Sequence, residues 1–441
     1  MKKIFIPILT ITTFTSLGHT ETLSLDQVWS KINSQSAAIE ASQLQTESLV
    51  LTKERASRHW LPKIYIDAKG FQTNNPGNSF VGLLEQRSLT QNDFNPESIN
   101  HPETHFYTRG ALGIDWALYE GNMKSHQVDF IQNSLNAQES MTHQVRLEQY
   151  SQVAQSYASI AILIQHKNKI QDLNQKMSSL IKNYQLGQKS NPVGYSGLLG
   201  MKSLSNRLTG LINQFNAQIN SDYNILKEMG LNNLQWLPVI KDVTTFADQN
   251  FFLNQQNLNH SESYKLQAVQ KTTQAIESLA HMEKAKFLPR IGAFAESALF
   301  KSNRDTADSY IAGIYLQWSL FDSSNYGSLK EADLKHQAMQ KNSVAFTQQE
   351  NAEKIALREA LTALQSNLNL LSESEKILIE QTQVTETLFK NGSLSALQFV
   401  EVLNRRTDLI TQKSEAELNY IKTASQYTKK QPHNLNKSEN Q

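Results

Sequence analysis

Two long stretches without helix breakers constrain the fold of this chain more than any other feature. Residues 122–186 and 328–391 contain neither glycine nor proline, although the chain has 17 Gly and 9 Pro among its 441 residues. As a single helix, each stretch would be about 95–100 Å long at ~1.5 Å rise per residue. Apolar residues within both stretches recur at alternating steps of three and four, which is typical of long helices packed against each other. We therefore expect a chain built around two rod-like helices.

The composition excludes several classes of protein. A mean hydropathy of −0.48 and 39% hydrophobic residues are low for a large packed core, but they suit long helices that bury one stripe. The formal net charge of +1 gives no electrostatic reason to expect a nucleic-acid partner. The chain has no cysteine, which excludes disulfides, thiolate metal sites, cysteine nucleophiles and a lipid anchor on cysteine.

The first 20 residues have the pattern of a secretory signal peptide. Lys2 and Lys3 form a positive region, residues 4–17 are apolar or small, and Gly18 or Thr20 could lie at a cleavage site. After this segment, no run approaches the ~18 apolar residues of a membrane-spanning helix. If the mature chain crosses a membrane, it must therefore do so as β-strands.

The chain has the same order of elements twice, which predicts two structural repeats. The first repeat covers 21–230, the second covers 259–428, and 231–258 is an equatorial linker between them. In the first repeat, strands at about 62–72 and 108–119, joined by a loop at 73–107, precede a long helix at about 122–186. In the second, strands at about 289–300 and 309–321 precede a long helix at about 323–390. The remaining residues, 429–441, are expected to be a disordered tail.

Three pairs of short segments support the repeat. Leu61-Pro62 matches Leu288-Pro289 before the first strand of each copy, and Gly187 matches Gly392 after each long helix. The segment 116–120 matches 318–322 at each junction between strand and helix. One face of each predicted strand is apolar, and Lys63, Asp67 and Asp115 fall on the other. Four strands cannot close a membrane barrel, so several chains would have to share one.

With these features, the chain resembles the TolC-like outer-membrane efflux protein family over essentially its whole mature length. The resemblance implies a fold that is mainly α with membrane β-strands. It implies a homotrimer whose 12-stranded β-barrel lies in the lipid of the outer membrane of a Gram-negative bacterium. A periplasmic α-helical barrel would continue it. The implied function is a non-enzymatic exit duct of a tripartite efflux pump or type I secretion system, without cofactor or nucleic acid. Its partners would be a periplasmic adaptor and an inner-membrane pump of RND, ABC or MFS type.

The resemblance also places a periplasmic aperture at the turns after the long helices. The family's aromatic position falls at Phe389, its basic position at Leu394, and its two acidic positions at Gln398 and Glu401. Most of the family's aperture charges are therefore replaced. A ring of Glu401 side chains could still form a cation-selective constriction. Two further lysines, Lys189 and Lys390, could add positive charge near the turns at Gly187 and Gly392. The alternative interpretation is that these are solvated turn residues.

Three tryptophans at strand ends, Trp60, Trp116 and Trp318, could be membrane-interface aromatics or packing anchors. His101 and His105 have the spacing of a metal pair, but Pro102 argues for a surface loop, and no metal or catalytic site is expected. The alternative to the duct is a periplasmic adaptor or structural coiled-coil protein of the envelope. An adaptor would have one helical hairpin and no pair of equal repeats.

Overall fold

The structure is a computed structural model, and it describes residues 21–184, 190–231, 236–253, 262–433 and 435. It divides into two units. Unit 1 contains the described parts of 1–40, 143–263 and 350–441, and unit 2 contains 41–142 and 264–349. Each unit therefore contains segments of both predicted repeats. The predicted signal peptide lies outside the described residues.

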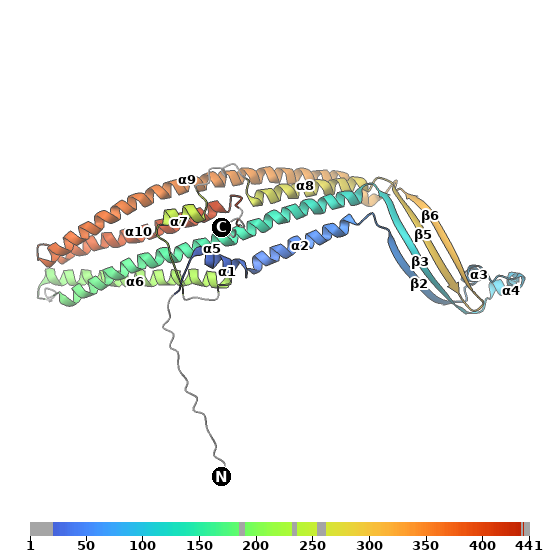
Figure 1. Cartoon of the computed structure of the whole chain (residues 1–441), viewed down its shortest axis with the longest axis horizontal. Helices are drawn as coiled ribbons and strands as arrows, with labels where there is room; N and C mark the ends of the chain where they lie inside the picture. Colours follow the sequence, from blue (N-terminus) through green and yellow to red (C-terminus); the bar gives the residue numbers. More distant parts are fainter. Residues whose placement is uncertain (1–20, 185–189, 232–235, 254–261, 434, 436–441) are drawn as a thin grey trace, which may run out of the picture. The chain divides into compact units, whose positions relative to one another are not determined.

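Unit 2 holds a four-stranded antiparallel sheet in the order β2-β3-β5-β6 (Figure 1). Its strands are β2 (Lys63–Thr73), β3 (His105–Glu120), β5 (Arg290–Lys301) and β6 (Thr306–Gln317). The β3–β5 pair joins the two predicted repeats, with Asp115 opposite Phe294 and a register shift between Ala117 and Tyr119. Within the sheet, β2 and β6 are the edge strands.

Helices enter and leave the sheet in unit 2. Helix α2 (Ala37–Ser57) precedes β2, and α8 (Tyr264–Ala285) precedes β5. Between β3 and the long helix α5 (Met123–Asn183), Gly121 has φ +65°. A Cβ at Gly121 would lie 2.7 Å from the carbonyl oxygen of Ala285 and 2.9 Å from Leu288 Cβ. Only glycine suits both the left-handed backbone and this close approach.

The connection between β2 and β3 corrects the sequence prediction, because 73–107 is not simply a loop. It contains α3 (Pro76–Glu85), the short 3₁₀ helix η1 (Gln91–Phe94) and α4 (Pro96–Asn100). Asparagine caps α3 and α4, and each has proline in its first turn. The asparagine side chains satisfy free N–H groups, and proline lacks the N–H that a first turn leaves unpaired. The asparagine- and proline-rich composition thus starts helices here.

Unit 1 is built mainly from helices. Beside its parts of α5 and of the second long helix α9 (Ser328–Lys390), it contains α6 (Pro192–Glu228) and α10 (Ala396–Thr428). Shorter elements complete it: β1 (Glu21–Leu23), α1 (Leu25–Asn33), β4 (Trp236–Pro238) and α7 (Val243–Asn250). The predicted linker 231–258 thus contributes β4 and α7, while 232–235 and 254–258 lie outside the described residues.

The core of unit 1 gathers around Tyr157 of α5. Its hydroxyl donates to the carbonyl of Leu23 at 2.8 Å and accepts from the N–H of Val239 at 2.9 Å. Its ring stacks on Trp236 and Phe246. Strands β1 and β4 pair in parallel, with Glu21 opposite Trp236. Tyr157 contacts Leu23 of β1 and Trp236 of β4, so it joins the long helix α5 to both strands of this small sheet.

Other parts of the prediction differ from the structure. The second strand of the second repeat ends at Gln317 instead of 321, and its long helix starts at Ser328 instead of 323. A 3₁₀ turn, η3 (Ser323–Asn325), capped by Asp322, and Gly327 with φ +84° occupy the difference. The start of the tail predicted to be disordered is packed, since Gln431 is 3% exposed and the His433 ring stacks on Phe252. Residues 434 and 436–441 are not described.

Candidate functional site: a two-faced sheet and a helix tip

One face of the sheet in unit 2 is apolar and exposed. By strand alternation and the pairing register, its residues come from all four strands. The large side chains on this face, each 40–88% exposed, include Ile64, Ile66, Leu112, Ile114, Trp116, Leu299, Tyr310, Ile314 and Leu316. An apolar patch of this extent is a surface for a membrane or for a partner protein.

The opposite face carries a network of charged and polar groups. Arg109 of β3 forms ion pairs with Asp67 of β2 at 2.9 Å and with Glu296 of β5. Glu296 also accepts a hydrogen bond of 3.2 Å from the hydroxyl of Tyr65. Lys63 and Asp115 lie opposite each other on this face, and strand alternation in the sequence had placed both away from the apolar face.

Aromatic side chains on the polar face lie over glycines of the neighbouring strand. A Cβ at Gly113 would lie 2.3 Å from the Tyr65 ring, and one at Gly292 would lie 2.3 Å from the Tyr315 ring. Glycine weakens a strand, and a cross-strand aromatic ring covers the exposed backbone. These pairs fix the register of the sheet, which keeps each set of side chains on its own face.

The three tryptophans lie near one end of the strands. Trp60 is three residues before β2, Trp116 is within β3, and Trp318 directly follows β6. Their exposed fractions are 62%, 41% and 54%. The indole N–H of Trp116 donates to the carbonyl of Trp60, and that of Trp318 donates to the carbonyl of Phe287. Two rings are thus exposed while their polar atoms are paired, which suits a membrane interface.

The second predicted site is the tip of unit 1, where α9 turns into α10. Gly392 has φ +74°, so glycine suits the end of α9. Ser395 caps α10 in a reciprocal arrangement with Gln398: the Ser395 hydroxyl accepts from the Gln398 N–H, and the Gln398 side chain accepts from the Ser395 N–H. Gln398, at one of the family's acidic positions, is therefore occupied in capping α10.

Three aromatic rings meet at this tip. Phe389 stacks on Phe399 with ring centroids 5.0 Å apart and on Tyr184 of the α5 end at 6.2 Å. Leu394 is half-buried in the turn. The family resemblance placed Phe389 at the aperture, and in the structure the Phe389 ring stacks on two other aromatic rings. Gly187 and Lys189 fall outside the described residues.

Two predicted charged residues of the tip have partners one helical turn away. Glu401 accepts from Arg405 at 3.2 Å, and Lys390 donates to Glu386 at 2.7 Å. The side chains of Glu401 and Arg405 are 60% and 61% exposed, so this ion pair contributes about 0–1 kcal/mol to stability. The Glu401 carboxylate is therefore open to solvent, with the Arg405 guanidinium beside it.

Deeper in unit 1, an ion cluster joins three helices. Glu375 of α9 accepts from Lys169 of α5 at 2.5 Å and from Lys413 of α10 at 2.6 Å. Burial raises the pKa of Glu375, but the hydrogen bonds from both lysines outweigh it and lower the pKa to about 2. The carboxylate is therefore charged at neutral pH and holds the two ammonium groups together.

Sequence reasoning missed several of these pairs. Arg109, Glu375 and His166 belong to no sequence motif. The Nε2 atom of His166, on α5, lies 2.8 Å from a carboxylate oxygen of Glu417, on α10, and both side chains are buried. A weak signal was available for Glu375, because it interrupts the spacing of Leu364, Leu368, Leu371 and Leu378. The partners could not be identified, since they come from distant parts of the chain. Within the described ranges, no group of three or more His, Asp or Glu residues could hold a metal ion, and His101 and His105 belong to no such group. None of the described helices is long and apolar enough to cross a membrane.

Comparison with known proteins identifies the class of fold. No family model matches the chain, and no curated protein matches it in sequence. Solved structures match over nearly the whole chain, and outer-membrane channels are among them. The chain therefore has the fold of TolC-like outer-membrane channels, which confirms the resemblance inferred from its sequence.

Three of the matching structures define the similarity. The CmeC outer-membrane channel of Campylobacter jejuni has a TM-score of 0.76 at 10% identity, covering 99% of this chain and 96% of CmeC. The outer-membrane protein VceC of Vibrio cholerae has a TM-score of 0.70 at 13% identity, with coverages of 92% and 96%. The open state of the MtrE channel of Neisseria gonorrhoeae has a TM-score of 0.72 at 12% identity, with coverages of 92% and 88%.

Proposed function

We propose that this protein is a passive exit duct in the outer membrane of a Gram-negative bacterium. The observation that carries the proposal is the two-faced sheet of unit 2. Its apolar face fits lipid, and its network of Arg109, Asp67 and Glu296 fits a water-filled lumen. The similarity to outer-membrane channels over nearly the whole chain supports the same function.

The sheet has two open edges, β2 and β6, and this supports the proposed assembly. An unpaired strand edge in lipid leaves polar backbone groups without partners, at a cost of several kcal/mol each. Three copies would pair β6 of one with β2 of the next and close a barrel of 12 strands. A homotrimer is therefore the proposed form, with two repeats in each chain and the long helices continuing the duct into the periplasm.

In this proposal the duct works with an adaptor protein in the periplasm and an inner-membrane pump of RND, ABC or MFS type, as part of an efflux or type I secretion system. The protein itself provides a path and performs no chemistry. A periplasmic adaptor with one helical hairpin would leave the exposed apolar face of the sheet without a role.

Fractionation and bilayer recording test the proposal together. The expected result is a heat-modifiable oligomer in the outer-membrane fraction that forms ion-conducting pores when reconstituted. A soluble periplasmic monomer without pore activity would contradict it. Crosslinking in intact cells, followed by identification of the proteins that co-purify, would identify the adaptor.

A further inference from the structure

The connection between β2 and β3 folds onto a particular face of the sheet. Helix α3 approaches Tyr107 so closely that a Cβ at Gly82 would lie 2.2 Å from the tyrosine ring. The Tyr107 hydroxyl donates to the carbonyl of Ser79 at 3.5 Å, and its ring stacks on Phe71 of β2. Tyr107 is 5% exposed as a result. Glycine at position 82 is thus what allows α3 to lie flat on the sheet.

The covered face is the polar one. Tyr107 is two residues from Arg109 on β3, and alternate residues of a strand share a face. The register agrees, because Phe71 pairs with Tyr107 and Asp67 pairs with Ala111. Helix α3 and this face enclose a cavity of about 210 Å³, whose lining includes Lys69, Glu85 and Arg109. Burial raises the pKa of the Glu85 carboxyl, and the charge of Arg109 partly opposes this.

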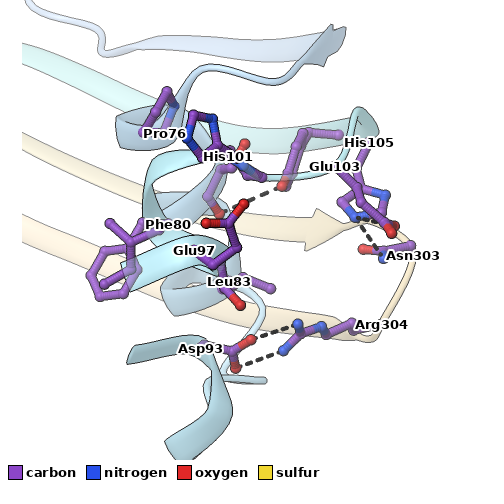
Figure 2. A pocket seen from close by; sticks show the side chains of 15 residues that line it. Pro76, Phe80, Leu83, Asp93, Glu97, His101, Glu103, His105, Asn303 and Arg304 are labelled. Atoms are coloured by element: carbon purple, nitrogen blue, oxygen red, sulfur yellow. Dashed lines mark hydrogen bonds and ion pairs between the residues drawn. The ribbon is translucent and has the colours of Figure 1, made fainter. Parts of the chain in front are cut away.

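An ion pair fastens the connection to the β5–β6 turn. Arg304 of this turn donates two hydrogen bonds to Asp93, at 2.7 and 2.6 Å (Figure 2). The carboxylate of Asp93 also accepts from the N–H and the hydroxyl of Thr90, and its side chain is 7% exposed. Nearby, the side-chain oxygen of Gln86 accepts from the N–H of Asp305. Segments about 200 residues apart in the sequence are therefore joined by several hydrogen bonds.

The connection has a hollow of its own beside this ion pair. A cavity of about 410 Å³ lies between α3, α4 and the strand ends, and its lining includes Phe80, Glu97, His105 and Arg304 (Figure 2). The segment is therefore a small folded body with an open interior, held to the sheet on one side and to the turn on the other.

We propose that residues 76–100 form a cap that narrows the outer mouth of the duct and excludes bulky hydrophilic solutes. This inference rests on the proposed function, because the polar face must line the lumen. A connection that only joined two strands could extend away from the sheet. Here it lies over the lumenal face at its outer end, and the pair of Asp93 and Arg304 keeps it there. The cap is a constriction at the end of the sheet where β5 turns into β6.

The Asp93–Arg304 pair holds the cap over a wide pH range. The hydrogen bonds from Arg304 and Thr90 hold the pKa of Asp93 far below its usual value. A lowered carboxyl pKa stabilises the folded form above the unfolded pKa, and this stability is lost only as pH falls through the folded pKa. Acid at about pH 4 should therefore leave the cap in place.

A thiol reporter can test the cap in intact cells, because the natural chain has no cysteine. Lys63→Cys places a single thiol on the polar face at the far end of β2. It would be exposed to two membrane-impermeant maleimides, one small and one carrying a bulky polyethylene glycol chain. We call the ion pair of Asp93 and Arg304 the latch. The latch variants are Asp93→Asn and Arg304→Gln. The matched control is Glu97→Gln, which changes the same charge in the same cap but leaves the ion pair intact.

We expect the small reagent to label the thiol at position 63 in all of these proteins. The large reagent should label it roughly tenfold faster in both latch variants than in the parent and the control, since tenfold corresponds to about 1.4 kcal/mol, the order expected for a charge-assisted hydrogen bond. The exchanged pair Asp93→Arg with Arg304→Asp should restore protection, which separates loss of the latch from loss of folding. Equal labelling by the large reagent in parent and latch variants would overturn the cap.

Failure of the proposed function would give a different result. An additional reporter, Ile66→Cys, lies on the apolar face, where the side chain is 81% exposed in the single chain. If the small reagent labels position 66 and not position 63, the polar face does not line the lumen, and both proposals are wrong. If it labels position 63 and not position 66, the proposed duct is supported. The labelling rate of position 63 with the large reagent then tests the cap.

Discussion

The indole nitrogen of Trp116 donates a hydrogen bond of 2.8 Å to the main-chain carbonyl of Trp60. In the second repeat, the indole nitrogen of Trp318 donates a bond of 3.0 Å to the carbonyl of Phe287. Trp60 and Phe287 are matching positions before the first strand of each repeat, and Trp116 and Trp318 match at the junction to the long helix. Each predicted repeat therefore has the same bond between the residue three positions before one strand and a tryptophan near the end of the next strand.

The tryptophans predict where the membrane surface lies. In variants that retain Trp116 or Trp318 as the only tryptophan, lipids brominated along their acyl chains should quench the fluorescence strongly. The reason is that both rings are exposed at the end of the apolar face while their N–H groups are paired. The measurement is the quenching efficiency in reconstituted vesicles as a function of bromine depth.

A variant that retains only Trp236 is the matched control. This ring is 1% exposed in the core of unit 1 and stacks on Tyr157. Its fluorescence should not change with brominated lipid. If Trp116 and Trp318 behave like Trp236, these strand ends do not lie at a membrane.

Glycines of α6 give a prediction about the packing near the tip. A Cβ at Gly197 would lie 2.6 Å from the Cβ of Ala396 on α10, so Gly197→Ala should destabilise the protein by about 1–3 kcal/mol through overpacking. On the same helix, Gly210 has no atom within 4 Å of such a Cβ. Gly210→Ala should therefore stabilise by about 0.5–1 kcal/mol through helix propensity alone. Thermal unfolding of both variants checks the opposite signs, and equal effects would show that α6 and α10 do not approach closely at Gly197.

The sequence predicts the elements of this fold better than the contacts between them. Long helices and strand pairs follow from the missing breakers at 122–186 and 328–391 and from alternation, which are local properties. Glu375 illustrates what is not local, because Lys169 and Lys413 lie 206 and 38 residues away. A heptad pattern places Glu375 on a helix face but does not say which helix faces it. The helices of residues 76–100 were missed for a different reason, which is local. The pair Asn75-Pro76 is equally typical of a turn and of a helix start.

Glu401 remains a prediction for the aperture. Its carboxylate is exposed and paired only loosely with Arg405, so a ring of such groups should favour cations. Glu401→Ala should shift the reversal potential in a salt gradient toward no selectivity. Arg405→Ala should shift it in the opposite sense, because it removes the neighbouring positive charge. Single-channel recordings check both signs, and unchanged selectivity in both variants would assign Glu401 to the solvated surface.

The cluster of Glu375, Lys169 and Lys413 predicts how stability depends on pH. The pKa of Glu375 is about 2 in the folded protein, compared with about 4.3 for an unperturbed glutamate. A carboxyl pKa lowered by folding adds stability above the unfolded pKa, and this is lost as pH falls through the folded pKa. The difference corresponds to at most about 3 kcal/mol, which solvent screening reduces, lost progressively between pH ~5 and pH ~2.

Glu375→Gln should remove this part of the pH dependence. It should also destabilise the protein at neutral pH by about 3–5 kcal/mol, because two partly buried ammonium groups lose their counter-charge. The measurement is the thermal midpoint of the detergent-solubilised protein from about pH 7 to about pH 2. Glu331→Gln is the control, since its pair with Lys335 is exposed and screened by solvent, and it should leave the curve nearly unchanged. Parallel curves for Glu375→Gln and the parent would mean that the cluster does not hold α5, α9 and α10 together.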